Sequence, residues 1–86
     1  MQLPSTFARR LHLARLNAGL EQRELGQMVG LTRDTIERLE RGQTTQISIR
    51  ALRKVARALN VTADWLIAMD VLDDETAEDL IATPHV

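Results

Sequence analysis

Apolar residues recur along the chain at intervals of three and four positions, the spacing that places side chains on one face of an α-helix. The pattern predicts helices over residues 5–18, 22–29, 33–41, 49–59 and 63–69, with a weaker sixth helix over residues 74–82. Glycine or a small polar residue stands at most of the predicted boundaries, as is common for helix caps. No segment alternates apolar and polar residues as a half-buried strand does. The pattern therefore predicts an all-α protein.

Two of the predicted helices have a clear apolar side. In the second helix it consists of Leu25, Met28 and Val29, and in the fourth of Ile49, Leu52, Val55, Ala56 and Leu59. We expect these side chains to face the core. The opposite side of the fourth helix carries Arg50, Arg53, Lys54 and Arg57, which we interpret as a solvated face.

The second and third predicted helices are joined only by Gly30-Leu31-Thr32. So short a turn makes the helices cross steeply. It requires a small residue where the backbones approach, which Gly26 provides, and a residue tolerant of positive φ, which Gly30 provides. This is the spacing of a helix-turn-helix over residues 22–41, whose second helix is placed to enter a DNA major groove.

The distribution of charged residues along the chain indicates more about function than the net charge of −1 does. Residues 1–61 hold all eleven basic residues and five acidic ones, whereas residues 62–86 hold seven acidic residues and no basic ones. A basic body with an acidic tail is typical of nucleic-acid-binding proteins, although two ordinary solvated faces are the alternative. With 86 residues, the chain fits a single domain, whose acidic C-terminal segment begins near residue 62.

Several function classes find no support in the composition. The chain has no cysteine, and its two histidines, His12 and His85, stand alone, so we expect no metal site. No phosphate loop, nucleophile elbow or dinucleotide fingerprint occurs, so we expect no cofactor and no enzymatic activity. There is no signal-peptide pattern and no apolar run of about 20 residues. We therefore expect a cytoplasmic protein that binds no membrane.

Many residues at fixed spacing carry a family resemblance. They are Arg15-Leu16-x-x-Gly19-Leu20-x-Gln22-x-Glu24-Leu25, Gly30-Leu31-Thr32, Thr35-Ile36-x-x-Leu39-Glu40-x-Gly42, Ala58-Leu59-x-Val61 and Asp64-Trp65-Leu66. Over roughly residues 7–69 the chain resembles the phage repressor/Cro class of proteins, also called the xenobiotic-response-element class. The resemblance implies a five-helix lambda-repressor-like DNA-binding domain that recognises an operator.

The resemblance also implies roles for individual residues. It implies base contacts from Arg33, Asp34, Thr35 and Arg38 and a phosphate contact from Gln22. Polar groups at helix starts and in the loop after the third helix also suit phosphate oxygens, so we expect phosphate contacts from Thr32, Arg41, Gln43, Thr44 and Thr45 as well. Arg38 suits a bidentate contact with guanine, and Asp34, one turn earlier, is placed to orient it. The alternatives are a plain ion pair of Arg38 with Asp34, one of Arg33 with Glu37, and simple caps or solvated loops at the phosphate positions. Arg15 and Glu40 match a pair that forms an internal salt bridge in some members.

The end of the resemblance region is rich in apolar residues. Trp65, Leu66 and Met69 are predicted to share one face, Ile67 points elsewhere, and Val71 and Leu72 follow. A dimer interface containing Trp65, Met69, Val71 and Leu72 is one account; a sixth helix that folds back over them is the other. We therefore interpret the chain as a repressor that binds a palindromic operator in double-stranded DNA as a homodimer. The alternative is an antitoxin that binds a toxin through its acidic tail and autoregulates its operon.

Overall fold

A computed structural model describes residues 6–44 and 46–67, and in these ranges every regular element is a helix. The helices are α1 (Thr6–Asn17), α2 (Gln22–Val29), α3 (Arg33–Glu40), α4 (Ile49–Leu59) and α5 (Ala63–Leu66). The prediction of an all-α protein with five helices is confirmed over the described residues. The predicted sixth helix over residues 74–82 lies outside the described residues. In the described ranges, no helix combines the length and the apolar character needed to span a bilayer.

Side-chain caps explain why three of the helices begin where they do. The hydroxyl oxygens of Thr32, Ser48 and Thr62 each accept a hydrogen bond from the backbone N–H three residues later, at 3.0–3.1 Å. Each bond satisfies one of the amide groups that a helix leaves free at its first turn. At the start of α2 the direction is reversed, since the Glu24 carboxylate accepts from the backbone N–H of Glu21 at 2.8 Å.

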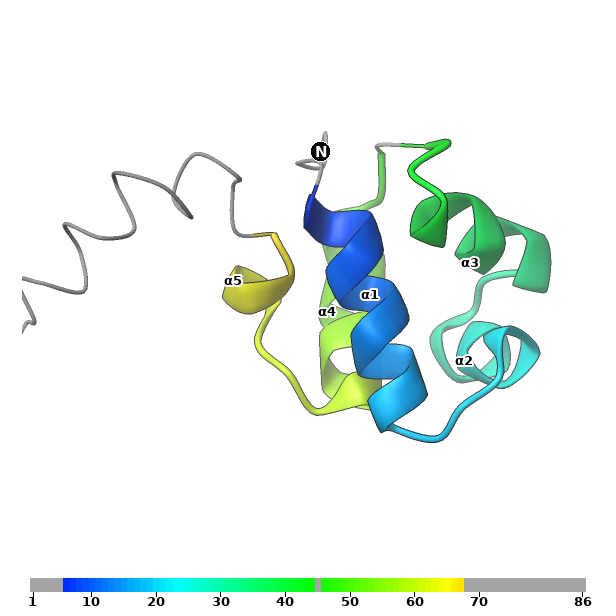
Figure 1. Cartoon of the computed structure of the whole chain (residues 1–86), viewed down its shortest axis with the longest axis horizontal. Coiled ribbons are helices and arrows are strands. Elements are labelled where there is room, and N and C mark those ends of the chain that lie inside the picture. Colours follow the sequence, from blue (N-terminus) through cyan, green and yellow to red (C-terminus); the bar gives the residue numbers. More distant parts are fainter. Residues whose placement is uncertain (1–5, 45, 68–86) are drawn as a thin grey trace, which may run out of the picture.

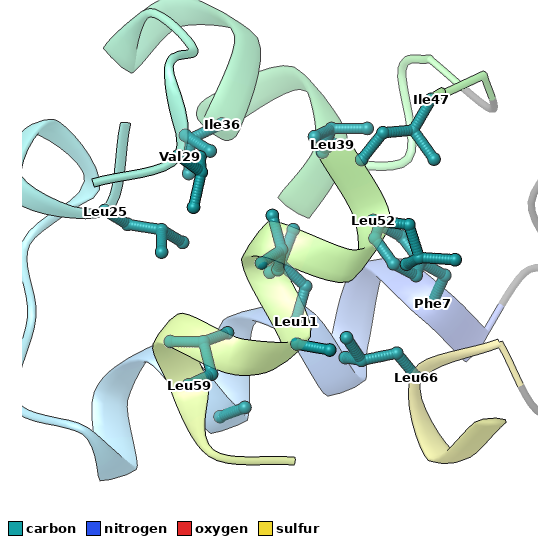
Figure 2. Packing of buried hydrophobic residues seen from close by; sticks show 13 residues of the cluster. Phe7, Leu11, Leu25, Val29, Ile36, Leu39, Ile47, Leu52, Leu59 and Leu66 are labelled. Carbon is teal, nitrogen blue, oxygen red and sulfur yellow. The ribbon is translucent and has the colours of Figure 1, made fainter. Parts of the chain in front are cut away.

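The helices enclose one core. Figure 1 shows α1 and α4 at the centre, with α2 and α3 on one side and α5 on the other. Seven large side chains are almost completely buried: Phe7, Leu11, Leu25, Ile36, Leu39, Val55 and Leu66. They come from all five helices and converge on one cluster (Figure 2). Burying each contributes ~1.5–3 kcal/mol, so this cluster is what fixes the short helices α2 and α3 in place.

Two residues assigned to the core from the pattern are exposed instead, and these predictions were wrong. Met28 is 56% exposed and Ile49 is 57% exposed. In α2 the core is filled by Leu25 and Val29, one turn apart, which leaves Met28 at the margin of the buried stripe. Ile49 is the first residue of α4, and at that end of the core Ile47, from the preceding loop, takes the buried position.

The predicted division of faces in α5 was also wrong. Leu66 is fully buried, Ile67 is half-buried against the core, and Trp65 remains 40% exposed. The helix is a single turn that packs against both α1 and α4, so its last residues are covered by the domain itself. Trp65 and Leu66 therefore point in different directions, and a second interface is not needed to cover Leu66 or Ile67.

Candidate nucleic-acid interface

The crossing of α2 and α3 determines where the candidate interface lies. Gly26 is buried at the crossing, where an added Cβ atom would lie 2.6 Å from the carbonyl oxygen of Leu31. Gly30 has a φ of 77°, and the N–H of Leu31 donates to the carbonyl of Gly26 at 2.9 Å. The close approach and the left-handed turn that the sequence required at these two glycines are both present. They direct α3 so that one side contacts the core and the other faces solvent.

The solvent side of α3 carries the predicted base-contacting residues. Arg33, Asp34 and Arg38 are exposed and Thr35 is half-buried, with its hydroxyl 2.9 Å from that of Thr32. These residues lie along α3, which Figure 1 shows at the edge of the molecule away from α5, so the polar side chains of α3 face solvent together.

The arginines of α3 differ in how firmly they are held. Glu37 pairs with Arg33 at 3.5 Å and with Arg41 at 3.1 Å. The nitrogen Nε of Arg38 lies 3.9 Å from the nearest carboxylate oxygen of Asp34, which is too far for a hydrogen bond. Arg38 is therefore the α3 arginine that is most weakly engaged within the protein.

The predicted phosphate-contacting residues gather at the starts of α2 and α3 and after α3. Gln22 lines an open cleft of about 400 Å³ together with Arg15, Glu21, Arg23 and Arg33. The hydroxyl oxygen of Thr32 caps α3 by accepting a hydrogen bond from the backbone N–H of Thr35. Arg41 and Gln43 are exposed and Thr44 is half-buried, while Thr45 lies outside the described residues. Amide and guanidinium groups around a cleft at a helix N-terminus are suited to hold a phosphate oxygen.

Behind this surface the structure brings Arg15 and Glu40 together. The Arg15 guanidinium donates to the two carboxylate oxygens of Glu40 at 2.5 and 3.0 Å and to the backbone carbonyl of Leu20 at 2.7 Å. The Glu40 side chain is only 4% exposed. The bidentate pair joins α1 to α3, and the bond to Leu20 fixes the turn between α1 and α2.

His12 is a member of this cluster that the sequence reasoning missed. Its Nδ1 lies 2.8 Å from Oε1 of Glu40, the oxygen that also accepts from Nε2 of Gln22 at 3.2 Å. The signal available in the sequence was its position three residues before Arg15, which places both side chains on one face of α1. Because Gln22 is held by the same carboxylate, the buried cluster is directly connected to the candidate phosphate-binding surface.

Both members of the buried pair have shifted pKa values. The hydrogen bond with Glu40 raises the pKa of Arg15 above its ordinary value, although burial lowers it. Burial raises the pKa of Glu40. The hydrogen bonds from Arg15, His12 and Gln22 lower it by more than burial raises it, so the pKa lies below its usual range. Glu40 is therefore charged throughout the neutral range despite its burial.

The lowered pKa of Glu40 predicts a loss of stability in acid. Its contribution is fully present above the unfolded-state value of ~4.3 and is lost as the pH falls through the lower folded-state value. Urea unfolding at successive pH values below ~5 measures this loss. In Glu40→Gln the free energy of unfolding is expected to fall less steeply over the same range, and equal slopes for the two proteins would rule out the contribution.

Arg10 and Trp65 form a further contact between α1 and α5. The Arg10 guanidinium lies over the Trp65 ring at 5.2 Å from its centroid and donates to the Trp65 carbonyl at 2.6 Å. The ring is therefore oriented by a cation–π contact while one side stays open to solvent.

Of the side chains that the structure describes, no three from His, Cys, Asp and Glu lie close enough to hold a metal ion.

Comparison with known proteins agrees with this geometry. The model of the family described as "Helix-turn-helix" matches residues 11–66, which include α2, α3 and the polar cluster of His12, Arg15, Gln22 and Glu40. The chain belongs to the helix-turn-helix family. The resemblance to the phage repressor/Cro class is confirmed by the solved structures that share the fold of this family member.

Three solved structures illustrate this likeness. The P22 c2 repressor, solved with a synthetic operator, is 28% identical, with a TM-score of 0.69 over 81% of this chain and 100% of that one. SinR, a master regulator for biofilm formation solved with DNA, is 28% identical, with a TM-score of 0.66 over 70% and 95% of the two chains. Hydroxypropylphosphonic acid epoxidase from S. wedmorenis, at 21% identity and a TM-score of 0.69, covers 78% of this chain and 35% of that one. It shares the fold alone.

Proposed function

We propose that this family member is a transcriptional repressor that binds a palindromic operator in double-stranded DNA as a homodimer. The observation that carries the proposal is the solvent side of α3, which presents Arg33, Asp34 and Arg38 beside the cationic cleft at the start of α2. A polar helix flanked by phosphate-binding groups is what major-groove recognition requires. Two relatives with this fold, the P22 c2 repressor and SinR, were solved with DNA. We assign the protein to the bacterial cytoplasm and nucleoid and give it no catalytic role.

The roles of the individual residues follow from their positions. Base edges are read by Arg38, with contributions from Arg33, Asp34 and Thr35. Phosphates are held by Gln22, Thr32, Arg41, Gln43, Thr44 and Thr45. The Arg15–Glu40 pair contributes by fixing α1, α3 and the turn before α2, which together position Gln22.

The dimer is assigned to the C-terminal side of the domain. Trp65 is the large apolar side chain that α5 leaves exposed, and it is already oriented by Arg10. Met69, Val71 and Leu72, the other proposed interface residues, lie outside the described residues. To meet successive major grooves, a two-fold interface at this end would have to hold the two α3 helices about 34 Å apart.

Selection of bound sites from random duplex DNA tests the operator and the dimer together. The expected product is an inverted repeat whose half-sites are centred ~10–10.5 base pairs apart. Enrichment of an isolated half-site, with the protein monomeric on DNA by sedimentation, would refute the dimer but not the DNA binding. No enrichment at any salt concentration would refute both.

Phosphate contacts predict a uniform loss of affinity. Gln22→Ala and Thr44→Ala are each expected to weaken binding to the selected site and to a scrambled site by the same factor, because phosphate contacts carry no sequence information. Gln27→Ala removes the same side chain as Gln22→Ala from an exposed position of α2 without an assigned DNA contact, so as the matched control it should leave both affinities unchanged. Titration of both sites at one fixed salt concentration measures the two factors, and a loss confined to the selected site would show that these residues read bases.

A further inference from the structure

The outer side of α4 carries four cations without a partner in the part of the chain that the structure describes. Arg50, Arg53, Lys54 and Arg57 are exposed at spacings that place them on one face, which we name the α4 basic face. None of them forms an ion pair with a described carboxylate, whereas Arg33, Arg38 and Arg41 near α3 all have an acidic neighbour at 3.1–3.9 Å. The α4 basic face therefore presents unneutralised charge.

A groove between α2 and α4 borders this face. It has a volume of about 470 Å³ and is lined by Met28, Lys54, Arg57 and Ala58. Met28 is more than half exposed there, so the groove combines an apolar side chain with two cations. Its chemistry fits an occupant that is acidic on one side and apolar on the other.

The chain itself contains a segment of that chemistry. Residues 73–82, which lie outside the described residues, read Asp-Asp-Glu-Thr-Ala-Glu-Asp-Leu-Ile-Ala. Five of the ten residues are acidic, and Leu80 and Ile81 follow directly after them. The acidic residues at 74, 75, 78 and 79 recur at the same four-residue interval as the cations of the α4 basic face.

The length of the chain allows this segment to reach the groove. The described part ends at Ile67, directly after α5, and α5 packs against α4. The six residues that follow Ile67, up to and including Asp73, span up to ~20 Å when extended. A helix with its side chains is ~10–12 Å across, so half of its circumference is roughly 16–19 Å, and a linker of this length can pass around α4 within one molecule.

We propose that residues 73–82 dock onto the α2–α4 groove of their own chain. The carboxylates face the α4 basic face, and Leu80 and Ile81 cover Met28. The contact involves no DNA and goes beyond the proposed function. Its effect is to neutralise the cations of α4, so that the remaining attraction for phosphate is concentrated at α3 and the start of α2.

Paramagnetic NMR on the full chain tests this docking. Because the chain has no cysteine, Ala82→Cys provides one site for a nitroxide label. The label is expected to abolish the methyl signal of Met28 and to broaden the amide signals of Lys54 and Arg57, relative to the reduced label. The amide of Arg38 on α3 should keep its intensity. Full intensity at all three groove residues would overturn the proposal.

Two charge-reversed proteins show whether the groove is the site. Lys54→Glu with Arg57→Glu should restore the Met28 signal. Arg9→Glu with Arg23→Glu makes the same change in net charge at two other exposed arginines and should leave the broadening intact. Equal recovery in both would overturn docking at the groove. In a mixture of spin-labelled and isotope-labelled chains, broadening as strong as within one chain would identify a second copy as the occupant and overturn docking in cis.

Discussion

Glu40→Ala is expected to lower the free energy of unfolding by ~3–5 kcal/mol, because it leaves the buried Arg15 guanidinium without its counter-charge. The substitution also removes the hydrogen bonds from His12 and Gln22 to the same carboxylate. In a domain of this size ~1 kcal/mol moves the Tm by ~4–8 °C, so the loss is large enough to threaten folding at physiological temperature. Urea and thermal unfolding followed by circular dichroism measure it.

Glu37→Ala is the matched control for this prediction. Glu37 lies on the same helix and pairs with two arginines, but those arginines are exposed and solvent weakens the interaction. Its replacement is expected to cost less than ~1 kcal/mol. If the two variants unfold at the same urea concentration, the Glu40 cluster contributes no more than a surface ion pair and its structural role is refuted.

The order of the helices, and the bounds of the first four to within one residue, were predictable because local chemistry determines them. The fifth helix, predicted over residues 63–69, ends at Leu66 instead. The threonine and serine caps, and the turn glycine at Gly30, act within three or four residues of the chain, so their signals are complete in the sequence. The crossing of α2 and α3 was predictable for the same reason, since three linking residues leave few geometries and Gly26 marks the contact.

The burial of residues at the margins was not predictable from periodicity. A helical stripe shows which side is apolar but not how far the neighbouring helices extend over it. Met28 and Ile49 lie beyond the area that the neighbouring helices cover, so they are exposed. Ile47, which belongs to no helix, fills part of the core instead. The position of α5 depends likewise on α1 and α4, which are distant in sequence, so the pattern assigned Leu66 to the wrong side.

The candidate site was predicted in part. The polar side of α3 follows from its own periodicity, and the structure places Arg33, Asp34 and Arg38 there. The connection of His12, Glu40 and Gln22 joins three helices, and its only local signal is the three-residue spacing of His12 and Arg15. How tightly each arginine is held by its neighbours also depends on rotamers and distances. Arg38 differs from Arg33 and Arg41 in lying farther from its carboxylate neighbour.

Arg38→Ala is expected to cost ~1–3 kcal/mol at the selected operator and much less at a scrambled one, because a bidentate contact to a guanine is lost. Arg38 is exposed and its carboxylate neighbour lies 3.9 Å away, so its guanidinium is available to a base without breaking a strong internal bond. For the same reason the Tm should not change. Titrations of both DNA sites at one fixed salt concentration measure the specificity ratio.

Arg41→Ala separates base reading from general attraction. It removes the same side chain three residues further on, at the end of α3, from a position assigned to phosphate. Its affinity for both sites is expected to fall by one common factor, so the specificity ratio is retained. Arg38→Ala should reduce that ratio and relax the preference at one position of each half-site. If Arg38→Ala behaves like Arg41→Ala, Arg38 is a phosphate contact, and the base must be read by another residue of α3.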